Sequence, residues 1–328
     1  MTTEESFTPI SNLLKLLNIE HILDEVDKNS FFPLKVPSSF VDKIEKNNPD
    51  DPLLKQILPL KSELENVDGF TPNPVQETEF MPAVGVLHKY YGRALVIVTQ
   101  KCSIHCRYCF RKHFPYSENN AEKEQWKSAI EYIKSDTSIS EVILSGGDPF
   151  SISDAKLSYL LEKINEISHI EFIRFHTRFL PTIPNRITDN LIKILEVYSN
   201  KISIIFHINH PNEIDEKLAE KVKLIRNTGI IVFNQSVLLH SVNDNIDILS
   251  NLSKKLYKSG IVPYYLHFLD KVQGASEFFV SENIACELIS QMRKTLPGYL
   301  IPRLVRENAG DMSKEYMPIN SRLTKNIG

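Results

Sequence analysis

The sequence has few cysteines, little net charge and no long apolar run, and each shortage excludes a class of protein. A net charge of −3 leaves no strongly basic surface for nucleic acid or an anionic membrane. No apolar run approaches the length that spans a bilayer. Residues 1–6 are acidic, which excludes the basic-then-apolar order of a signal peptide. Only four cysteines occur, three of them in one loop, and such thiols persist best in a reducing cytoplasm.

The rest of the composition is that of an ordinary globular protein. Apolar residues make up 42% of the chain and charged residues 24%. A length of 328 residues is enough for one large domain or two smaller ones. We therefore expect a cytoplasmic protein whose chemistry is carried by a few local motifs.

The most informative motif contains three cysteines and lacks a fourth. Cys102, Cys106 and Cys109 follow the spacing C-x3-C-x2-C. Zinc and iron–sulfur sites of the four-cysteine type need another thiolate, and none lies nearby. Three thiolates suit a four-iron cluster in which one iron stays open. An open iron can bind a substrate or cofactor, so this spacing indicates chemistry more than scaffolding.

Two other interpretations of these cysteines remain open at this point. Zinc could take the three thiolates with His105 or His113, although structural zinc sites usually consist of two short pairs separated by a longer loop. The thiols could also be buried without a ligand, but their concentration in one loop argues against simple packing. Metal–ligand preferences favour the iron–sulfur cluster. The remaining Cys286 lies in 281–296, a stretch with helical periodicity, and is expected to be a small core residue.

From about residue 93, short apolar runs alternate with amphipathic stretches. The later runs begin roughly every 30 residues, the size of one βαβ unit. This alternation predicts an α/β fold with a parallel sheet and right-handed crossovers. Six units favour a partial (β/α)6 barrel of the TIM type, although a doubly wound sheet would show the same rhythm. The expected strands are 94–98, 141–144, 172–175, 202–206, 230–233 and 263–268. The expected helices include 122–134, 156–167, 189–197, 216–226 and 246–256.

Residues 1–87 differ from this repeating part. Apolar spacing over 10–26 and 40–64 predicts helices, with a turn and a helix start at 48–52. Residues 68–79, which contain two prolines, predict an extended linker. The expected organisation is a helical N-terminal extension and linker over 1–87, a barrel over 88–300 and a C-terminal segment over 301–328.

Every expected strand runs directly into a polar or glycine-rich segment. The carboxyl ends of barrel strands carry the active site, so these endings predict one large polar site. Taken singly, several have ordinary explanations: Asp148 as a helix cap, Gln235 as a satisfied core amide, and Arg93 or Arg111 as a surface charge. The endings are the cysteine loop, 145–149, 176–178, 207–213, 234–236 and Asp270.

Together these motifs resemble the radical S-adenosylmethionine enzymes, and within them the lysine 2,3-aminomutase family. The likeness covers roughly residues 70–320. It is carried by HKYYGR at 88–93, CRYCFR at 106–111, LSGGD at 144–148, TR at 177–178, FHINHPNE at 206–213 and NQSVLL at 234–239. The branch that serves β-lysylation of elongation factor P is most similar. The motifs for that branch are FRKHFPY at 110–116, PYYLH at 263–267, LDKVQG at 269–274, and RE at 306–307 followed by SK at 313–314.

The resemblance implies three cofactors. Cys102, Cys106 and Cys109 would bind a [4Fe-4S] cluster whose open iron chelates S-adenosylmethionine. Lys314 would bind pyridoxal 5′-phosphate as a Schiff base. The other implied contacts are Gly146, Gly147, Asp148, His207 and Gln235 for S-adenosylmethionine, and Lys89, Tyr90 and Arg93 for the pyridoxal phosphate.

The resemblance also implies the reaction, in which the protein orients the cofactors and excludes quenching groups. One electron from the iron–sulfur cluster would cleave S-adenosylmethionine, and the resulting radical would take hydrogen from the β-carbon of lysine. The nitrogen, held as an imine of pyridoxal phosphate, would then migrate. Arg111 would bind the substrate carboxylate and Asp270, with Glu307, the side-chain ammonium. Two carboxylates there favour a cationic substrate over a glutamate-type one.

Two departures from longer family members favour the elongation factor P branch. Free-lysine mutases generally have arginine where Lys89 stands, and they continue past the pyridoxal lysine into a cysteine-bearing zinc segment. The sequence ends soon after Lys314, so we predict no zinc. The implied partners are L-lysine, a flavodoxin- or ferredoxin-type electron donor and, functionally, the elongation factor P lysyl ligase. The alternatives are a catabolic or osmolyte aminomutase and, more remotely, a zinc-binding module without activity.

Overall fold

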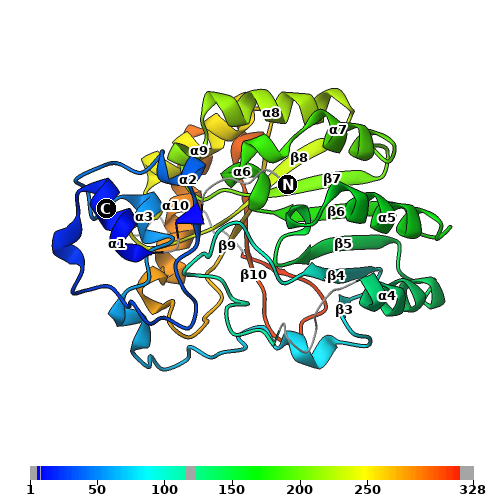
Figure 1. Ribbon diagram of the computed structural model, residues 1–328, viewed down its shortest axis with the longest axis horizontal. Coiled ribbons are helices and arrows are strands. Elements are labelled where there is room, and N and C mark those ends of the chain that lie inside the picture. Colours follow the sequence, from blue (N-terminus) through cyan, green and yellow to red (C-terminus); the bar gives the residue numbers. More distant parts are fainter. Residues whose placement is uncertain (1–5, 8, 116–122, 318–328) are drawn as a thin grey trace.

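A nine-stranded sheet forms the centre of the computed structural model, which describes residues 6–7, 9–115 and 123–317 (Figure 1). Strands β4 to β10 run parallel, and β3 and β11 add antiparallel edges. The strands are β3 (Val86–Tyr90), β4 (Arg93–Thr99), β5 (Glu141–Gly146), β6 (Phe172–Thr177), β7 (Ile202–His207), β8 (Ile231–Val237), β9 (Val262–His267), β10 (Arg303–Arg306) and β11 (Glu315–Tyr316).

The strand order decides between the two folds that the sequence left open. Neighbouring strands follow one another along the chain from β3 to β11, without the reversal that defines a doubly wound sheet. The sheet is therefore an open, partial barrel, as predicted. All six expected strands are present, with ends shifted by a few residues. Sequence reasoning missed β3, β10 and β11. β10 is short and has an arginine at each end, β3 ends in polar residues, and β11 has only two residues.

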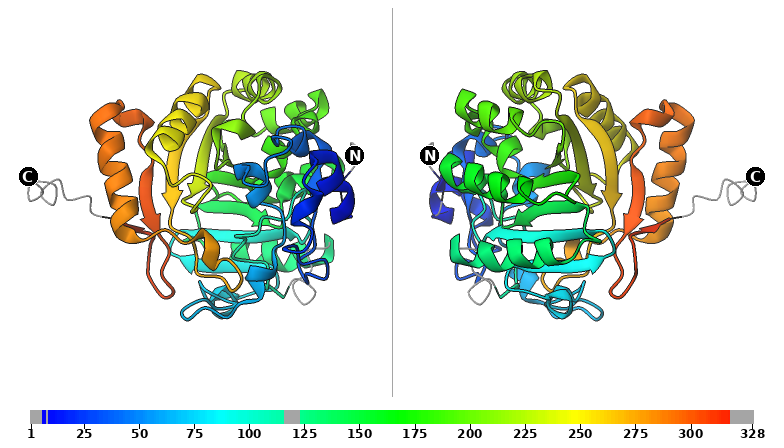
Figure 2. Two further views of the ribbon diagram at one scale, coloured as in Figure 1. Left: turned by 90° about the vertical axis from the view of Figure 1, so that its left-hand side faces the viewer. Right: turned by 90° about the vertical axis from the view of Figure 1, so that its right-hand side faces the viewer.

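Helices cover the outer face of the curved sheet (Figures 1 and 2). Side-chain caps start several of them, for example Ser153, Thr188 and Asp215. No helix in the described ranges is long and apolar enough to span a membrane. The helices are α4 (Lys123–Ser135), α5 (Asp154–Asn165), α7 (Asp189–Glu196), α8 (Glu216–Asn227), α9 (Ile246–Lys258) and α10 (Glu282–Thr295). Short turns of helix between them are η4 (Pro149–Ser151), α6 (Phe179–Thr182), η5 (Pro184–Arg186), η6 (Pro211–Glu213), η7 (Ser276–Phe278) and η8 (Gly298–Leu300).

The expected helices of the barrel are confirmed, including the stretch around Cys286. That residue lies in α10 and packs against the apolar cluster on this helix, but it is only half-buried, so the prediction of a core residue is confirmed only in part. Residue 122, where the first barrel helix was predicted to begin, lies outside the described ranges, as does Tyr116 of the FRKHFPY motif. The main apolar core lies between the sheet and the outer helices.

The long helices predicted within residues 1–87, which we call the N-terminal segment, are wrong. Asn18 adopts a left-handed conformation that ends the first helix, and Pro59 lies where a long second helix would need an amide donor. Asp51 and Pro52 do start a helix, as predicted. The observed elements are β1 (Ser6–Phe7), α1 (Ile10–Leu17), η1 (Glu20–Ile22), β2 (Val36–Pro37), α2 (Ser38–Val41), α3 (Pro52–Lys55), η2 (Lys61–Leu64) and η3 (Glu77–Phe80). These short elements enclose an apolar core of their own.

Candidate active site

A cavity of about 360 Å³ opens at the carboxyl ends of the parallel strands. Every residue that the sequence predicted for a site lines it, so one cavity unites motifs spread from β3 to the end of the described chain. These residues are Cys102, Cys106, Cys109, Lys89, Tyr90, Arg93, Arg111, Gly146, Gly147, Asp148, His207, Gln235, Asp270, Glu307 and Lys314.

Two groups of contacts divide the cavity. We call the three cysteines with Asp148 and His207 the cysteine side. We call Lys89, Asp270, Glu307 and Lys314 the lysine side.

The thiols of the cysteine side are partly buried and protonated when free. Burial is the largest effect and raises the pKa of Cys102 and Cys106, and it raises the pKa of Cys109 to about 12. Nearby Arg and Lys side chains oppose this effect without cancelling it. Metal binding must therefore displace protons from these thiols. Among the described residues, no three His, Cys, Asp or Glu side chains are arranged to hold a single metal ion.

The two histidines considered as zinc ligands lie outside the cavity that the thiols line. The ring of His105 stacks on Phe32, and its Nδ1 donates to the Pro33 carbonyl at 2.8 Å. The ring of His113 stacks on Phe31. Since both imidazoles are engaged elsewhere, the arrangement favours a site built from the three thiols and a ligand from the cavity.

The glycines after β5 press against the start of the cysteine loop. Gly146 has φ +109°, which disfavours any side chain, and a Cβ on Gly147 would lie 2.4 Å from the Lys101 carbonyl oxygen. The Gly147 amide donates to the Thr99 carbonyl at 2.6 Å, and the Asp148 amide donates to that of Lys101 at 2.7 Å. This close backbone packing, which only glycine permits, holds the cysteine loop against β5.

Asp148 braces the neighbouring strand end through its buried carboxylate. It accepts hydrogen bonds from the Thr177 hydroxyl at 2.9 Å and from the backbone amides of Arg178 at 2.7 Å, Phe179 at 2.8 Å and Phe150 at 3.1 Å. Burial outweighs these donors and raises its pKa to about 6. The capping role considered from the sequence is thus present, and direct contact of Asp148 with a cofactor stays a prediction.

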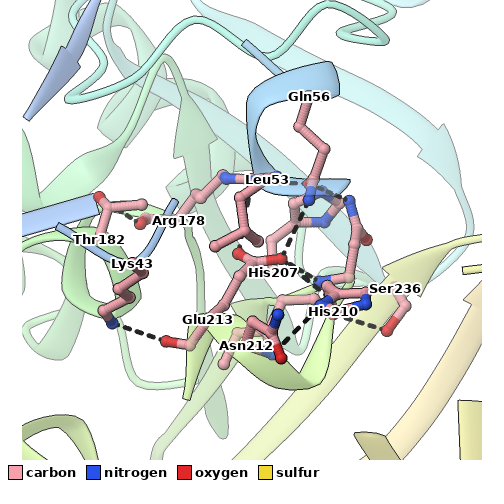
Figure 3. A network of polar contacts seen from close by, with 12 residues as sticks. Lys43, Leu53, Gln56, Arg178, Thr182, His207, His210, Asn212, Glu213 and Ser236 are labelled. Atoms are coloured by element: carbon pink, nitrogen blue, oxygen red, sulfur yellow. Dashed lines mark hydrogen bonds and ion pairs between the residues drawn. The ribbon is translucent and has the colours of Figure 1, made fainter. Parts of the chain in front are cut away.

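His207 belongs to a polar network that joins the barrel to the N-terminal segment (Figure 3). Its Nε2 lies 2.9 Å from the Tyr108 hydroxyl, which also accepts a hydrogen bond from Asn209 at 2.6 Å. Gln56 Oε1 accepts from Arg178 at 2.9 Å and from Asn209 at 3.1 Å. Burial lowers the pKa of His207 well below its usual value, so the ring is neutral.

The β-sheet register explains why His207 and Gln235 share this cavity. The two residues are paired across β7 and β8, and Gln235 is paired in turn with Tyr265 of β9. Gln56 was missed by sequence reasoning, because it stands in a helical turn far from any strand end and only the fold brings it to the rim.

On the lysine side, Glu307 bridges two lysines. Its carboxylate pairs with Lys314 and, at 3.2 Å, with Lys89. Burial alone would raise the pKa of Glu307, but the two ammonium groups hold it down at about 2. Lys89 stands on β3 and Glu307 follows β10, so this ion pair links opposite edges of the open sheet.

Asp270 has the opposite electrostatic character. Burial and the charge of Glu307 raise its pKa to about 7, and the ammonium of Lys314 only partly offsets them. The carboxyl is therefore ready to ionise when a cation enters the cavity.

Several buried polar atoms of this cavity have no hydrogen-bond partner among the described residues. Near the lysine side these are Arg93 Nε, His176 Nε2 and His267 Nε2. Buried polar atoms are normally satisfied, so such a group of unpaired atoms indicates a missing polar ligand. In the sequence, His176 and His267 stand out only as parts of longer motifs. Each lies at or next to the last residue of a barrel strand, and this position could have identified them as site residues.

Arg111, predicted to bind the substrate carboxylate, already holds a carboxylate of the protein. Its Nε and Nη2 donate to the two oxygens of Glu77 at 2.7 and 2.6 Å, while Nη1 donates to Ser145 at 3.2 Å. Glu77 begins η3 in the predicted linker and also lines the cavity. Glu77 thus orients one edge of the Arg111 guanidinium. No pattern in the sequence predicts this pairing.

Comparison with known proteins agrees with this geometry. The Radical SAM superfamily model matches residues 96–251. The chain is 43% identical to an L-lysine 2,3-aminomutase of Escherichia coli, over 96% of this chain and 93% of the relative. It is 34% identical to an L-lysine 2,3-aminomutase of Clostridium subterminale, over 84% of this chain and 66% of the relative.

Among solved structures, a radical SAM methyltransferase from Sphaerobacter thermophilus is similar, with a TM-score of 0.48 and 15% identity. The matched region covers 67% of this chain and 68% of the methyltransferase. The family relationship rests on the sequence relatives, which agree in name and match almost the whole chain. Radical enzymes of this superfamily use S-adenosylmethionine and a [4Fe-4S] cluster. The chain therefore belongs to the lysine 2,3-aminomutase family of radical S-adenosylmethionine enzymes and is an isomerase.

Proposed function

We propose that this enzyme converts (S)-α-lysine to (R)-β-lysine with the help of pyridoxal 5′-phosphate. One observation carries the proposal: a single cavity is lined by three thiols on one side and by Lys314, Asp270 and Glu307 on the other. The proposed radical source and the proposed site for a cationic amino acid would then share one cavity.

Cys102, Cys106 and Cys109 would hold the iron–sulfur cluster. When bound, this cluster supplies the electron that starts radical chemistry on S-adenosylmethionine. The neutral ring of His207 and the side chain of Gln235, adjacent in the sheet, would line the bed for that cofactor. The tight packing at Gly147 would keep the cysteine loop beside it.

Lys314 would attach the pyridoxal phosphate, with Lys89, Tyr90 and Arg93 around its phosphate. The buried and unpaired Arg93 Nε fits an anionic, hydrogen-bonding group. When bound, the cofactor supplies a conjugated π-system that allows nitrogen to migrate between adjacent carbons. Lys89 gives a point charge rather than the fork of an arginine.

The substrate would lie between Arg111 and the two carboxylates. Arg111 would meet its carboxylate, oriented by Glu77. Asp270 and Glu307 would meet its side-chain ammonium. Attachment of Lys314 to the cofactor removes one of the two ammonium charges that Glu307 now balances, which makes this carboxylate available to a new cation.

The product would serve the modification of elongation factor P. The motifs at 110–116 and 269–274 and the lysine at position 89 support this branch of the family. A partner ligase would attach the β-lysine to a lysine of elongation factor P, and a flavodoxin or ferredoxin would reduce the iron–sulfur cluster.

The direct test is a reconstituted assay. Reduced, iron-loaded protein is incubated with L-lysine, S-adenosylmethionine and pyridoxal phosphate, and β-lysine is sought by chiral chromatography with mass detection. We expect (R)-β-lysine, and none when pyridoxal phosphate is omitted. Cleavage of S-adenosylmethionine without β-lysine would assign the enzyme another substrate. Adding the ligase and elongation factor P then tests the destination of the product, through the mass of the modified factor.

A further inference from the structure

The N-terminal segment holds the cysteine loop from outside the barrel. Arg107 stands between Cys106 and Cys109 and is 1% exposed. Its guanidinium donates hydrogen bonds to residues of the N-terminal segment. It donates to both carboxylate oxygens of Glu63, from Nε at 2.7 Å and from Nη2 at 2.6 Å. It also donates to the Phe32 carbonyl at 2.6 Å. The charge in the middle of the thiol motif is thus neutralised by a residue of the N-terminal segment.

Backbone and apolar contacts fasten the same loop to the same segment. The His105 amide donates to the Lys35 carbonyl at 2.9 Å, and the Arg107 amide to the Gln56 carbonyl at 2.9 Å. Ile104 is 3% exposed and packs into the apolar core of the N-terminal segment rather than that of the barrel. Ile104 and Arg107 of the loop are therefore anchored in the N-terminal segment. Ser103 and Tyr108 of the same loop bond instead to Thr182 and His207 of the barrel.

Lys112 adds a connection just after the last thiol. Its ammonium lies 3.4 Å from the Glu63 carboxylate and donates to the carbonyls of Arg107 at 3.3 Å and Gly274 at 2.9 Å. Glu63 thus receives two cations of the loop at a half-buried point. Within the loop itself, only short turns such as the Cys109 amide to the Cys106 carbonyl at 3.0 Å give regular structure.

We infer that Glu63 is a positioning residue for the three thiols and that the N-terminal segment acts as the clamp for the metal-binding loop. Loss of the Glu63 charge leaves the Arg107 guanidinium buried without its ionic partner, which is strongly unfavourable. The loop would relieve this by moving Arg107 toward water, and the neighbouring thiols would move with it. The first of the two tests does not depend on the proposed function. Only the second test rests on the proposed assignment of these thiols to the iron–sulfur cluster.

The first measurement needs no cofactor. Full-length, metal-free Glu63→Gln protein is treated with a maleimide under native, reducing conditions, and alkylation of each cysteine is followed by peptide mass spectrometry. We expect alkylation of Cys106 and Cys109 to become about tenfold faster or more. A tenfold increase corresponds to a free energy of opening of the loop that is lower by about 1.4 kcal/mol. Cys286, in α10, is the internal control and should keep its rate.

A matched variant separates clamping of the loop from general loosening of the segment. Lys43→Gln removes another ion pair between the N-terminal segment and the barrel, from Lys43 to Asp215 at 3.0 Å, where Lys43 is also well buried. The Lys43 ammonium also donates to the Glu213 carbonyl, and neither Glu213 nor Asp215 belongs to the cysteine loop (Figure 3). Its thiol alkylation should match that of the unaltered protein. Equal acceleration in both variants would overturn the inference.

The second measurement uses reconstituted protein. Glu63→Gln should lose iron to a chelator several times faster than the unaltered protein and Lys43→Gln, and iron retention equal to theirs would count against the clamp. If the proposed function fails while thiol protection still depends on Glu63, the clamp stands and the role of the loop changes.

Should Glu63→Gln not fold, as judged by circular dichroism, Glu63→Asp retains the charge. It should show a smaller acceleration, and unchanged thiol rates in it would contradict the proposal.

Discussion

The two sides of the cavity are built in opposite ways. On the cysteine side, most polar groups are satisfied within the protein: Asp148 accepts four donors and His207 bonds to Tyr108, while Arg178 Nε and Nη1 are the exceptions. Behind this side, Arg107 pairs with Glu63. On the lysine side, the buried atoms include several without a partner, and one carboxylate balances two lysines.

The difference follows from what each side has to do. A loop that receives a metal cluster must have its ligands placed in advance, so the surrounding bonds are made by the protein. A site that binds a charged substrate needs groups whose bonds are completed by the ligand, so some remain unpaired without it. The predictions below test this contrast, beginning with the largest expected effect.

Replacing Cys106 by alanine should abolish cleavage of S-adenosylmethionine. The loop would then offer two thiolates in place of three, too few to hold the cluster with one open iron. Methionine and 5′-deoxyadenosine, measured by chromatography after reduction, should be undetectable. Cys286→Ala should behave like the unaltered protein, because Cys286 is a core neighbour in α10. Cleavage retained by Cys106→Ala would refute the assignment of the thiols.

Replacing Lys314 by alanine should abolish β-lysine formation and spare the cysteine side. After incubation with pyridoxal phosphate and borohydride, the intact mass should show a covalently attached pyridoxyl group in the unaltered protein and none in the variant. The iron content should be unchanged, because Lys314 contacts Glu307 and not the thiol loop. Lys294→Ala, an exposed lysine of α10, is the control. Undiminished labelling of Lys314→Ala would move the cofactor to another lysine.

Replacing Asp270 by asparagine should weaken lysine binding by about 10²-fold, since loss of one partner of a buried charge pair costs roughly 2–5 kcal/mol. Binding of S-adenosylmethionine should change little. Both can be measured by calorimetry on the iron-loaded protein. Equal losses for the two ligands would make Asp270 a structural residue and would remove the contrast between the two sides.

Lysine binding should also weaken as the pH falls. The pKa of Asp270 is raised to about 7, so below that pH the carboxyl is protonated in the free enzyme and must lose its proton to pair with an ammonium. The apparent dissociation constant should rise up to about tenfold per pH unit below 7. The same measurement on Asp270→Asn should show a much flatter profile. A persistent slope would point to another group.

Local patterns in the sequence predicted most of the barrel, namely six of the nine strands of its sheet. Apolar runs and amphipathic stretches identified six strands and their helices, because burial against one face imposes a short period on the chain. The same reasoning failed for residues 10–64, where Asn18 and Pro59 interrupt helical spacing. It also missed β10, whose four residues carry arginines at both ends.

The candidate site was predictable to a similar degree. The cysteine spacing alone indicated a metal loop, and strand endings indicated the rim. The partners of the predicted residues were not predictable: Glu77 on Arg111, Glu63 on Arg107 and Gln56 in the His207 network. All three come from the N-terminal segment, which carries no motif, and their roles exist only through contact.

The thiol loop and the polar strand ends can be read from spacing within a few residues. Which groups face them depends on the folded chain. The curvature of the open sheet brings Lys89 of β3 to Glu307 beyond β10, 218 residues apart. The N-terminal segment likewise brings Glu63 to Arg107, 44 residues later. Such pairs form because buried charges need partners, and which partners are near is a property of the folded chain.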